Sequence, residues 1–493
     1  MKFKIFIFLL LFALSSCEKN LKPVIYDRLS STNFPVTEAD ASVFVTGIYG
    51  EFRGTGAWNR YSIDPESRLM MGEYGTEECF INWDWCNLPQ LNFDFNPNYG
   101  IWATFYNNMV PAVTKATAAI AQLKTVSFTD KNLQTRLIAE VKGIRAMWMY
   151  DLEGFFGPPQ VVLDEKAALN PQELYYPPRL SEDEYLKFME TDLLDIINVL
   201  PTNQVQYGRF TKGAAMTMLL KFYMRHKQWE KAAGISAQII ALGKYQLLTN
   251  YKDIWNVDAN TETIFALPCI ALPSPNSNII RPHVLPPDYV SPTGGKVTAW
   301  SGYRVPWSTW DSFDTDDIRR SVLVKDYYVN LNGVTTLVDG RATNRLPTGA
   351  LPLKYGEDPA SDGLFAGNDL VILRYADVLL LRAEALNKLN GPNVESIALI
   401  NQIRNRAFNN NAVKRIKLSD FTNTDSLNDY LLKERLWEFC FEGERREDLI
   451  RHGKYIQYAR NRGKNAQDYQ VRYPIPYGAI IEGKGKIIQN SGY

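Results

Sequence analysis

The chain has 493 residues, and its 54 lysines and arginines balance its 54 aspartates and glutamates. This balance argues against nucleic acid as a partner, because phosphate binding needs an excess of positive charge, and three histidines leave little room for histidine-rich metal sites. Hydrophobic residues make up 45% and charged residues 22%, an ordinary globular mixture that excludes a fully disordered chain, while aromatic residues reach 13%.

The chain begins with the pattern of an export signal. Two lysines precede ten consecutive apolar residues, 5–14, a run too short to cross a bilayer but typical of a secretory signal. The two serines and Cys17 that follow resemble a bacterial lipobox, in which the cysteine thiol is lipidated. We therefore expect residues 1–16 to be a lipoprotein signal peptide, Cys17 to carry a membrane anchor, and residues 17–35 to form a linker. Ordinary secretion with cleavage near Cys17 is the alternative.

The remaining cysteines form no metal-binding or redox pattern, because no two of them are separated by two residues. An exported chain permits a disulfide between Cys79 and Cys86, although a fold of this size does not need one. Cys440 falls in an apolar helical run and is expected to be a buried thiol.

Residues 36–493 are predicted to form a single unit built on pairs of α-helices. Apolar residues recur at helical spacing in pairs at about 102–155, 212–244 and 369–408, and in a further helix at about 427–451. Small residues in the second of these pairs would let its two helices approach closely. This pattern resembles a tetratricopeptide helix pair, whose repeat is about 34 residues long.

Several residues mark where these helices begin and end. Thr37 is followed by acidic residues and is expected to be an N-cap. Ser181 and Glu184 match a capping box before a predicted helix at 182–200. Gly243 stands where the helix pair at 212–244 needs a residue in the left-handed conformation.

Two long segments without helical periodicity, 54–100 and 268–312, interrupt the pairs. Both are broken by glycine and proline, and together they carry six of the eleven tryptophans. Long loops in a compact protein are usually functional or disordered, and the aromatic content of these two favours function. We therefore expect a mainly α scaffold with an irregular, loop-rich ligand-binding lobe, mainly 54–100 and 268–365, inserted through it.

Four stretches form a distinctive set in this order along the chain. They are GIRAMWMYDLEGFFGPPQVV at 143–162, RYADVLLLRAEALN at 374–387, ERLWEFCFEGERREDLIRHG at 434–453, and YPIPYGAIIEGKGKIIQNSGY from Tyr473 to the end. Each stretch alone is weak, but the ordered set closely resembles the SusD/RagB family of outer-membrane nutrient-binding lipoproteins. The resemblance covers essentially the whole mature chain.

This resemblance implies a location and a function as well as a tetratricopeptide-like fold. The chain would be anchored in the outer membrane by lipid and exposed at the cell surface. It would capture an oligosaccharide or polysaccharide and deliver it to a SusC-like TonB-dependent transporter, without catalysis and without a cofactor. Capture of peptides, as in the RagB branch, is the alternative. A secreted glycoside hydrolase and an interaction scaffold without a soluble ligand also stay open.

The stretch 434–451 alternates acidic and basic residues at helical spacing. Two of its carboxylates could act as the acid pair of a glycoside hydrolase. The structural interpretation is a network of ion pairs between helices. Because each acid has an arginine close by in the sequence, its pKa should be lowered, which opposes an acid role and favours the ion pairs.

The aromatic loops contain the candidate ligand-binding residues. Flat rings cover the C–H faces of a neutral sugar, and amide or charged side chains bond its hydroxyls. The candidates are Trp58, Tyr61, Tyr74, Trp83, Trp85, Asn87, Tyr289, Trp300, Tyr303, Arg304, Trp307 and Trp310. Alternation along a strand would place Trp83 and Trp85 on one face. Each aromatic residue has the alternative of anchoring the loop core, which is the commoner position for a single tryptophan.

A cluster of aspartates, Asp311, Asp314, Asp316 and Asp317, offers oxygen ligands of the kind that Ca²⁺ prefers. It lacks the glycine and the closing glutamate of an EF-hand loop. An N-cap before Ile318 is the better interpretation, so we expect no metal here.

Overall fold

The computed structural model describes residues 34–53, 60–169, 177–274 and 276–493. Cys17 and Trp58 lie outside these residues, so the predicted lipid anchor and one candidate tryptophan stay predictions. None of the helices within the described ranges is long and apolar enough to cross a membrane.

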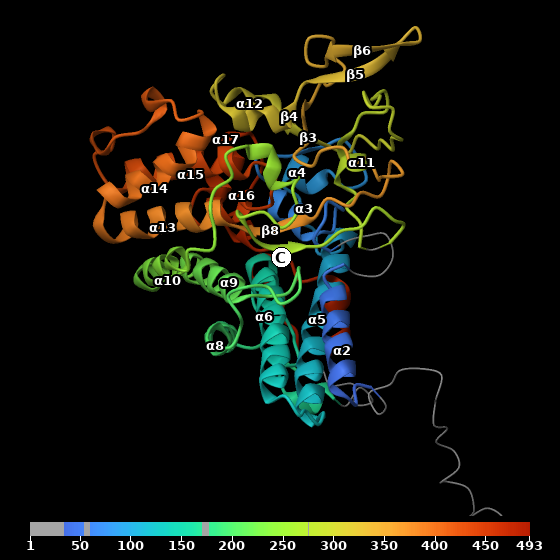
Figure 1. Ribbon diagram of the computed structural model, residues 1–493, viewed down its shortest axis with the longest axis vertical. Coiled ribbons are helices and arrows are strands. Elements are labelled where there is room, and N and C mark those ends of the chain that lie inside the picture. Colours follow the sequence, from blue (N-terminus) through green and yellow to red (C-terminus); the bar gives the residue numbers. More distant parts are fainter. Residues whose placement is uncertain (1–33, 54–59, 170–176, 275) are drawn as a thin grey trace, which may run out of the picture.

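A stack of α-helices forms the scaffold, as predicted. Its members are α2 (Glu38–Gly50), α5 (Gly100–Thr125), α6 (Lys131–Phe156), α8 (Glu182–Ile197), α9 (Lys212–Arg225), α10 (Trp229–Ala241), α13 (Tyr375–Asn390), α14 (Val394–Ala407), α15 (Thr424–Phe439) and α16 (Arg445–Arg451). Neighbours in chain order pack on one another, from α5 on α6 to α13 on α14 (Figure 1). Helix α10 packs directly on α13, although residues 242–374 separate them in the sequence.

The predicted helix ends are confirmed where capping chemistry specified them. The Thr37 side chain accepts a hydrogen bond from the Asp40 backbone N–H, and Ser181 forms a capping box with Glu184. Gly243 follows α10 with a φ of +61°. These caps stabilise helix ends by satisfying backbone groups that have no partner inside the helix.

Two predicted helices differ from the structure. Residues 370–374 form a strand rather than the start of α13, because this β-branched and leucine-rich run pairs with a strand at 263–267. The predicted helix at 427–451 is broken into α15 and α16 around Gly443, which has a φ of +75°. A Cβ on Gly72 would lie 2.1 Å from the Gly443 carbonyl oxygen, so the break lets α3 (Arg68–Glu73) approach the backbone closely.

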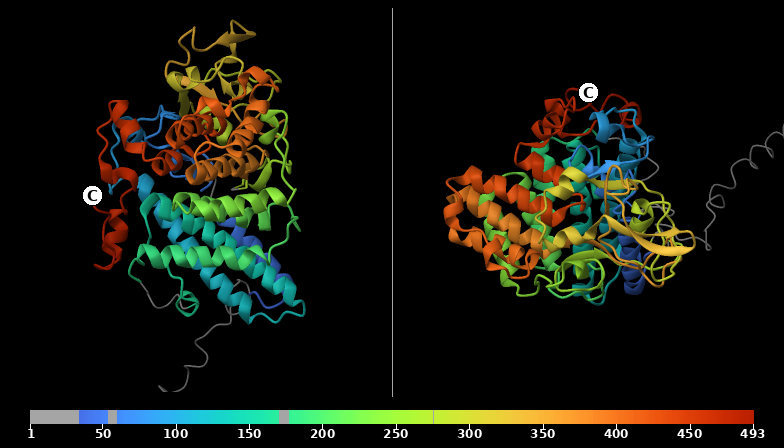
Figure 2. Two further views of the ribbon diagram at one scale, coloured as in Figure 1. Left: turned by 90° about the vertical axis from the view of Figure 1, so that its left-hand side faces the viewer. Right: turned by 90° about the horizontal axis from the view of Figure 1, so that it is seen from above.

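The loop lobe is held together by short antiparallel strands. A four-stranded sheet has the order β1 (Phe80–Ile81), β3 (Tyr303–Pro306), β7 (Gly349–Pro352) and β4 (Leu323–Val324). Two further pairs are β2 (Thr263–Leu267) with β8 (Leu370–Arg374), and the hairpin β5 (Asp326–Leu331) with β6 (Val334–Asp339), which projects from the top of the molecule (Figures 1 and 2).

Strand pairing joins the two predicted loop segments. Phe80 of β1 lies opposite Arg304 of β3, so the segment 54–100 and the segment 268–312 meet in one sheet. The short helices α4 (Leu88–Asn92), α11 (Ile280–Val284) and α12 (Trp307–Asp311) flank this sheet. The aromatic residues of both segments are therefore brought to one part of the molecule.

Candidate ligand-binding site

The charged stretch 434–451 is a buried ionic network rather than an exposed acid pair. Glu438 is fully buried, and its carboxylate pairs with Arg319, Arg374 and Arg406. Burial alone would raise the pKa of Glu438, but these three arginines lower it to about 2. A carboxyl group with so low a pKa does not hold a proton for general-acid catalysis at neutral pH.

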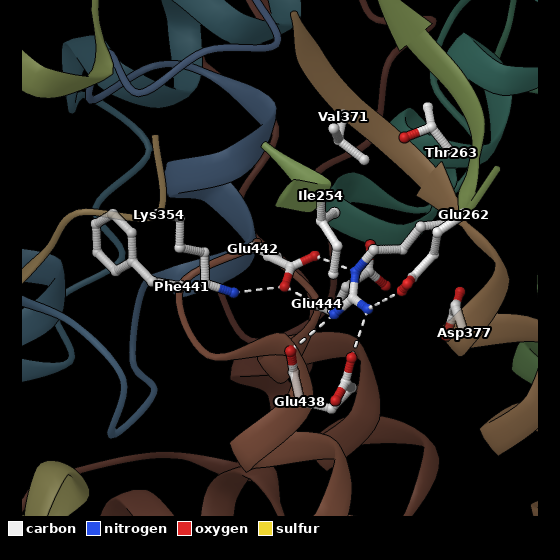
Figure 3. Close-up of polar contacts among 12 residues, drawn as sticks. Ile254, Glu262, Thr263, Lys354, Val371, Asp377, Glu438, Phe441, Glu442 and Glu444 are labelled. Atoms are coloured by element: carbon white, nitrogen blue, oxygen red, sulfur yellow. Dashed lines mark hydrogen bonds and ion pairs between the residues drawn. The ribbon is translucent and has the colours of Figure 1, made fainter. Parts of the chain in front are cut away.

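The arginines of this network come from distant parts of the chain. Arg319 follows the loop segment, Arg374 ends β8, and Arg406 lies in α14, whereas the sequence pattern predicts partners three or four positions away. The pair Arg451–Asp448 does follow helical spacing. Figure 3 shows Glu262, Glu438 and Glu442 directed toward one guanidinium group, that of Arg374, and Lys354 directed toward Glu442. The network thus joins helices and the lobe rather than stabilising one helix.

The aspartate cluster is divided among separate structural roles. Asp317 is the N-cap before Ile318, as predicted, and its carboxylate also pairs with Arg319. Asp311 pairs with Arg341, and Asp314 pairs with a lysine of the neighbouring loop. The described part of the chain contains no group of three or more histidine, cysteine, aspartate or glutamate side chains that could hold a metal ion.

An open, largely apolar cleft lies where the two loop segments meet. It has a volume of about 330 Å³. Its lining residues are Pro65, Glu66, Trp83, Trp85, His283 and Trp300. The cleft therefore contains three of the candidate tryptophans, two from the first segment and one from the second.

Trp83 and Trp85 lie in a turn after β1, not in a strand as predicted, yet their rings still come together. The ring centroids are 6.1 Å apart and the planes differ by 17°, so the rings are stacked. Trp83 is half-buried and donates its indole N–H to the Trp300 carbonyl oxygen at 3.0 Å. Trp85 is 64% exposed. A Cβ on Gly302 would lie 2.5 Å from the Trp83 ring, so the second segment fits closely around the first.

His283 forms the floor of the cleft between two of the tryptophans. Its ring packs edge-on against Trp300 at 4.7 Å and against Trp83 at 5.6 Å between centroids. Its Nδ1 lies 2.8 Å from the Ile279 carbonyl oxygen, and its Nε2 lies 3.3 Å from Oδ1 of the buried Asp64. Both ring nitrogens therefore face oxygen atoms of the protein. The pair fixes the position of both indole rings.

Three tyrosine candidates are buried and do not reach the surface. The Tyr61 hydroxyl donates to the Asp151 carboxylate, and the Tyr74 hydroxyl donates to the Pro65 carbonyl oxygen at 2.9 Å. Tyr303 is fully buried beneath the cleft. Each of the three packs in the loop core, which is the alternative to ligand binding given above for a single aromatic residue.

The polar candidates Arg304 and Asn87 are structural as well. Arg304 is buried, and its guanidinium donates to the Val284 carbonyl oxygen at 2.8 Å and to the Ser301 hydroxyl. Asn87 is buried and donates to the Asp84 carboxylate at 3.1 Å. Both side chains fasten backbone turns in place instead of facing the cleft.

Trp307 and Trp310 form a second aromatic cluster, outside the cleft. Their rings pack edge to face at 5.7 Å. Their indole N–H groups donate to the carbonyl oxygens of Leu346 and Leu323, both at 2.9 Å. The Arg341 guanidinium covers the Trp307 ring at 4.6 Å. Their ring faces are thus already occupied by the protein.

Tyr289 also lies away from the cleft. It is half-buried, and its ring stacks on Tyr327 at 6.5 Å. Its hydroxyl accepts a hydrogen bond from Arg281 at 3.3 Å. These contacts attach the loop to the β5–β6 hairpin.

The cysteines near the cleft are not joined to each other. Cys79 and Cys86 are both free and buried, so the disulfide that the sequence permits is absent from the structure. Burial raises the pKa of the Cys86 thiol to about 12, which keeps it protonated and unreactive at neutral pH. Cys440 is likewise a buried free thiol, as predicted.

Three residues of the site were not among the sequence candidates: Glu66, His283 and Asp64. His283 carried a weak signal, because it is one of three histidines in the chain and lies in a proline-rich segment with several candidate aromatics. Glu66 and Asp64 carried none, since an isolated acid in a loop is usually solvated surface.

Comparison with known proteins agrees with the family resemblance predicted from the sequence. The model of the SusD family matches residues 324–493. The predicted resemblance to the SusD/RagB family is confirmed. The chain is 23% identical to SusD-like protein P38 of Formosa agariphila, and the alignment covers 97% of this chain and 96% of that protein.

Solved structures of SusD-like proteins share the fold. A SusD homolog from Bacteroides thetaiotaomicron superposes with a TM-score of 0.78 at 22% identity, covering 94% of this chain and 99% of that one. Surface glycan-binding protein A from the same organism, solved in complex with laminarihexaose, has a TM-score of 0.74 at 20% identity and covers 92% of this chain and all of that one. The mainly α, tetratricopeptide-like architecture is thereby confirmed for this chain.

Proposed function

We propose that the chain is a non-catalytic glycan-binding protein of the cell surface, and that the cleft around Trp83, Trp85 and Trp300 is its ligand site. The single observation that carries this proposal is the cleft itself, an open hollow of about 330 Å³ whose walls are largely aromatic. Sugar rings present apolar C–H faces that stack on such surfaces with little loss of side-chain entropy.

The exposure of the rings supports a binding role over a packing role. Trp85 is 64% exposed while it stacks on the half-buried Trp83. Exposing a large apolar surface to water is unfavourable, and contiguous exposed apolar patches commonly mark binding sites. The indole of Trp83 is pinned by the Trp300 carbonyl oxygen, so the stacked pair is already in place before a ligand arrives.

The charged stretch 434–451 does not support the hydrolase alternative. Its buried acid Glu438 has a pKa of about 2, so it does not supply a general acid. Surface glycan-binding protein A, which shares the fold, was solved with a laminarihexaose ligand. We therefore extend glycan binding, and not hydrolysis, to this chain.

The wider setting follows from the family resemblance and from the amino-terminal sequence. Lipidation at Cys17 would attach the chain to the outer membrane, with the described residues exposed at the cell surface. A SusC-like TonB-dependent transporter would then receive the captured oligosaccharide. Co-purification of the full-length chain with such a transporter from membranes, and its loss from membranes on Cys17→Ala substitution, tests this part of the proposal.

Calorimetric titration of residues 18–493 with a panel of oligosaccharides, laminarihexaose included, tests the ligand site. We expect binding to at least one glycan, and a loss of about tenfold or more in affinity for Trp83→Ala, Trp85→Ala and Trp300→Ala. Trp310→Ala is the matched control, because this ring is also half-buried in the lobe but lies in the second cluster. Its affinity should stay unchanged.

Two results would contradict the proposal. Binding to a peptide library but to none of the glycans would favour peptide uptake. Release of shortened products during incubation with a polysaccharide, abolished by a single carboxylate substitution, would favour a hydrolase.

A further inference from the structure

We infer that Glu66 determines which glycans enter the cleft, and that it selects uncharged sugars over sugars that carry carboxylate or sulfate. This inference rests on the proposed function of the cleft. Glu66 is the acidic member of the lining, and the other lining residues are tryptophan, proline and histidine.

Among the described residues, the Glu66 carboxylate has no side-chain partner, and its hydrogen bond is to its own backbone N–H. It is half-buried at the wall of the cleft. Among the described residues, no lysine or arginine forms an ion pair with it and no side chain donates a hydrogen bond to it. By contrast, Asp64, two residues earlier, lies 3.3 Å from the imidazole of His283. A carboxylate has about four acceptor sites, so a partly desolvated one with a single backbone donor leaves hydrogen-bonding capacity for a ligand.

The described lining of the cleft contains one acid, Glu66, and no lysine or arginine. The buried Asp64 lies 3.3 Å from the His283 ring. Arg304 is buried, and its guanidinium donates to the Val284 carbonyl oxygen and the Ser301 hydroxyl. A ligand in the cleft therefore meets an acidic side chain with no basic side chain of the described lining beside it.

This arrangement matches the chemistry of a neutral sugar. Sugar hydroxyls can donate to the oxygens of the carboxylate while the ring stacks on an indole face, and charge-assisted hydrogen bonds of this kind are the stronger ones. A carboxylate or sulfate on the ligand would instead meet Glu66 with the same sign of charge in an environment partly shielded from water. Such like-charge contacts act against the wrong ligand and so give specificity.

Burial raises the pKa of Glu66, and the neighbouring Asp64 raises it further, while a backbone hydrogen bond and His283 lower it. Because its pKa is raised, Glu66 stays protonated to a higher pH than an ordinary glutamate. We therefore expect discrimination against acidic ligands to strengthen as the pH rises and Glu66 loses its proton. The cleft would therefore be more permissive in mildly acidic solution.

A matched pair of polymers tests the inference. Laminarin and laminarin oxidised to carboxylate at C6 share a backbone and differ in charge, so their affinities for residues 18–493 can be compared by calorimetry at pH 7.5. We expect the wild type to bind the neutral polymer at least tenfold more tightly. Glu66→Gln keeps the size of the side chain and removes its charge, and it should reduce this preference to about threefold or less. Glu482→Gln, an exposed acid outside the lining, is the control and should preserve the preference.

The outcomes separate this inference from the function on which it rests. Equal affinity of the wild type for both polymers, or an unchanged preference in Glu66→Gln with an unchanged melting temperature, overturns the role of Glu66 and leaves the cleft as a glycan site. Tighter binding of an amino-sugar polymer than of either laminarin overturns the assignment to neutral glycans. Failure of the wild type to bind any glycan overturns both.

Discussion

The charged groups around Glu438 are paired with one another and buried. In the cleft, by contrast, the stacked tryptophans and Glu66 are partly exposed and have few partners. Glu438 contacts three arginines and is fully buried. Trp85 is largely exposed, and among the described residues the Glu66 carboxylate has no side-chain partner. Polar groups that already have all their partners hold a structure in one state, and groups that lack partners are available to a ligand. The network around Glu438 therefore stabilises the fold, whereas the cleft is available for ligand binding.

Removing one charge from the buried ionic network around Glu438 should have the largest effect on stability. Glu438→Gln leaves three buried arginines without one of their carboxylates, so we expect a loss of about 3–5 kcal/mol in the free energy of unfolding. Urea denaturation followed by circular dichroism measures it. The exposed pair Lys124–Glu165 is the control, and Lys124→Met should cost less than about 1 kcal/mol. Equal small losses in both variants would show that the buried network does not stabilise the fold.

A pH-dependent effect is expected at a second buried acid, Glu73. Its side chain accepts a hydrogen bond from the Gly443 backbone N–H at 2.7 Å. Burial raises its pKa to about 7, although this hydrogen bond, Thr76 and Lys354 lower it. Because the folded-state pKa is raised, the stability from Glu73 is full below its unfolded pKa of about 4.3 and is lost as the pH rises through 7.

Glu73→Gln should therefore stabilise the protein at pH 8, by up to about 3 kcal/mol, and leave it unchanged at pH 4. Urea denaturation at both pH values measures the difference. Glu438→Gln has the opposite sign, since a pKa lowered to about 2 adds stability above pH 4.3 that is lost as the pH falls toward 2. A stabilisation by Glu73→Gln that is equal at both pH values would contradict the ionisation argument.

In the cleft, substitution should separate affinity from stability. Trp85→Ala removes an exposed ring, so we expect a loss of about 2 kcal/mol in glycan binding, or about 30-fold in affinity, with less than about 0.5 kcal/mol in unfolding. Calorimetry and urea denaturation give the two values. The buried Trp148 is the opposite case, and Trp148→Ala should cost about 3–5 kcal/mol in unfolding. A large stability loss in Trp85→Ala would show that this ring is a packing residue.

The smallest effect concerns how the cleft is assembled. Gly302→Ala places a methyl group 2.5 Å from the Trp83 ring, so the ring has to shift, at a cost of about 1–2 kcal/mol in unfolding and several-fold in glycan affinity. Gly234→Ala is the matched control, because nothing lies within 4 Å of its Cβ in helix α10. It should be neutral or stabilise by about 0.5–1 kcal/mol. Unchanged affinity in Gly302→Ala would show that the position of Trp83 is not critical.

The sequence was sufficient for features that depend on local chemistry. Caps at Thr37 and Ser181 and the helical periodicity located the helix pairs correctly, because both signals arise from residues close together in the chain. The strand at 370–374 was missed, since its partner at 263–267 is distant in sequence and strand propensity depends on that context. The break at Gly443 was missed for the same reason, because it is set by the approach of Gly72.

The site was predictable in part. A concentration of tryptophan in two loops pointed to the lobe, but no pattern within a loop separates Trp85, which is exposed, from Trp310, whose ring is covered by arginines. The two segments come together through β1 and β3, a pairing that the sequence did not reveal. Glu66 and His283 became candidates when that pairing placed them beside the indole rings.

The pairing of β2 with β8 has a consequence for how such proteins diversify. These neighbouring antiparallel strands lie about 5 Å apart, and they carry the chain out of the helical stack and back into it, with α10 and α13 in direct contact behind them. Residues 268–369 therefore leave and re-enter the stack at adjacent ends, but Arg319 and Lys354 within them pair with Glu438 and Glu442 beside the helices. Replacing this segment alone would remove Trp300 and His283, which contact Trp83. A new ligand preference would then require coordinated changes in both cleft-forming segments, with the residues that pair with the stack retained.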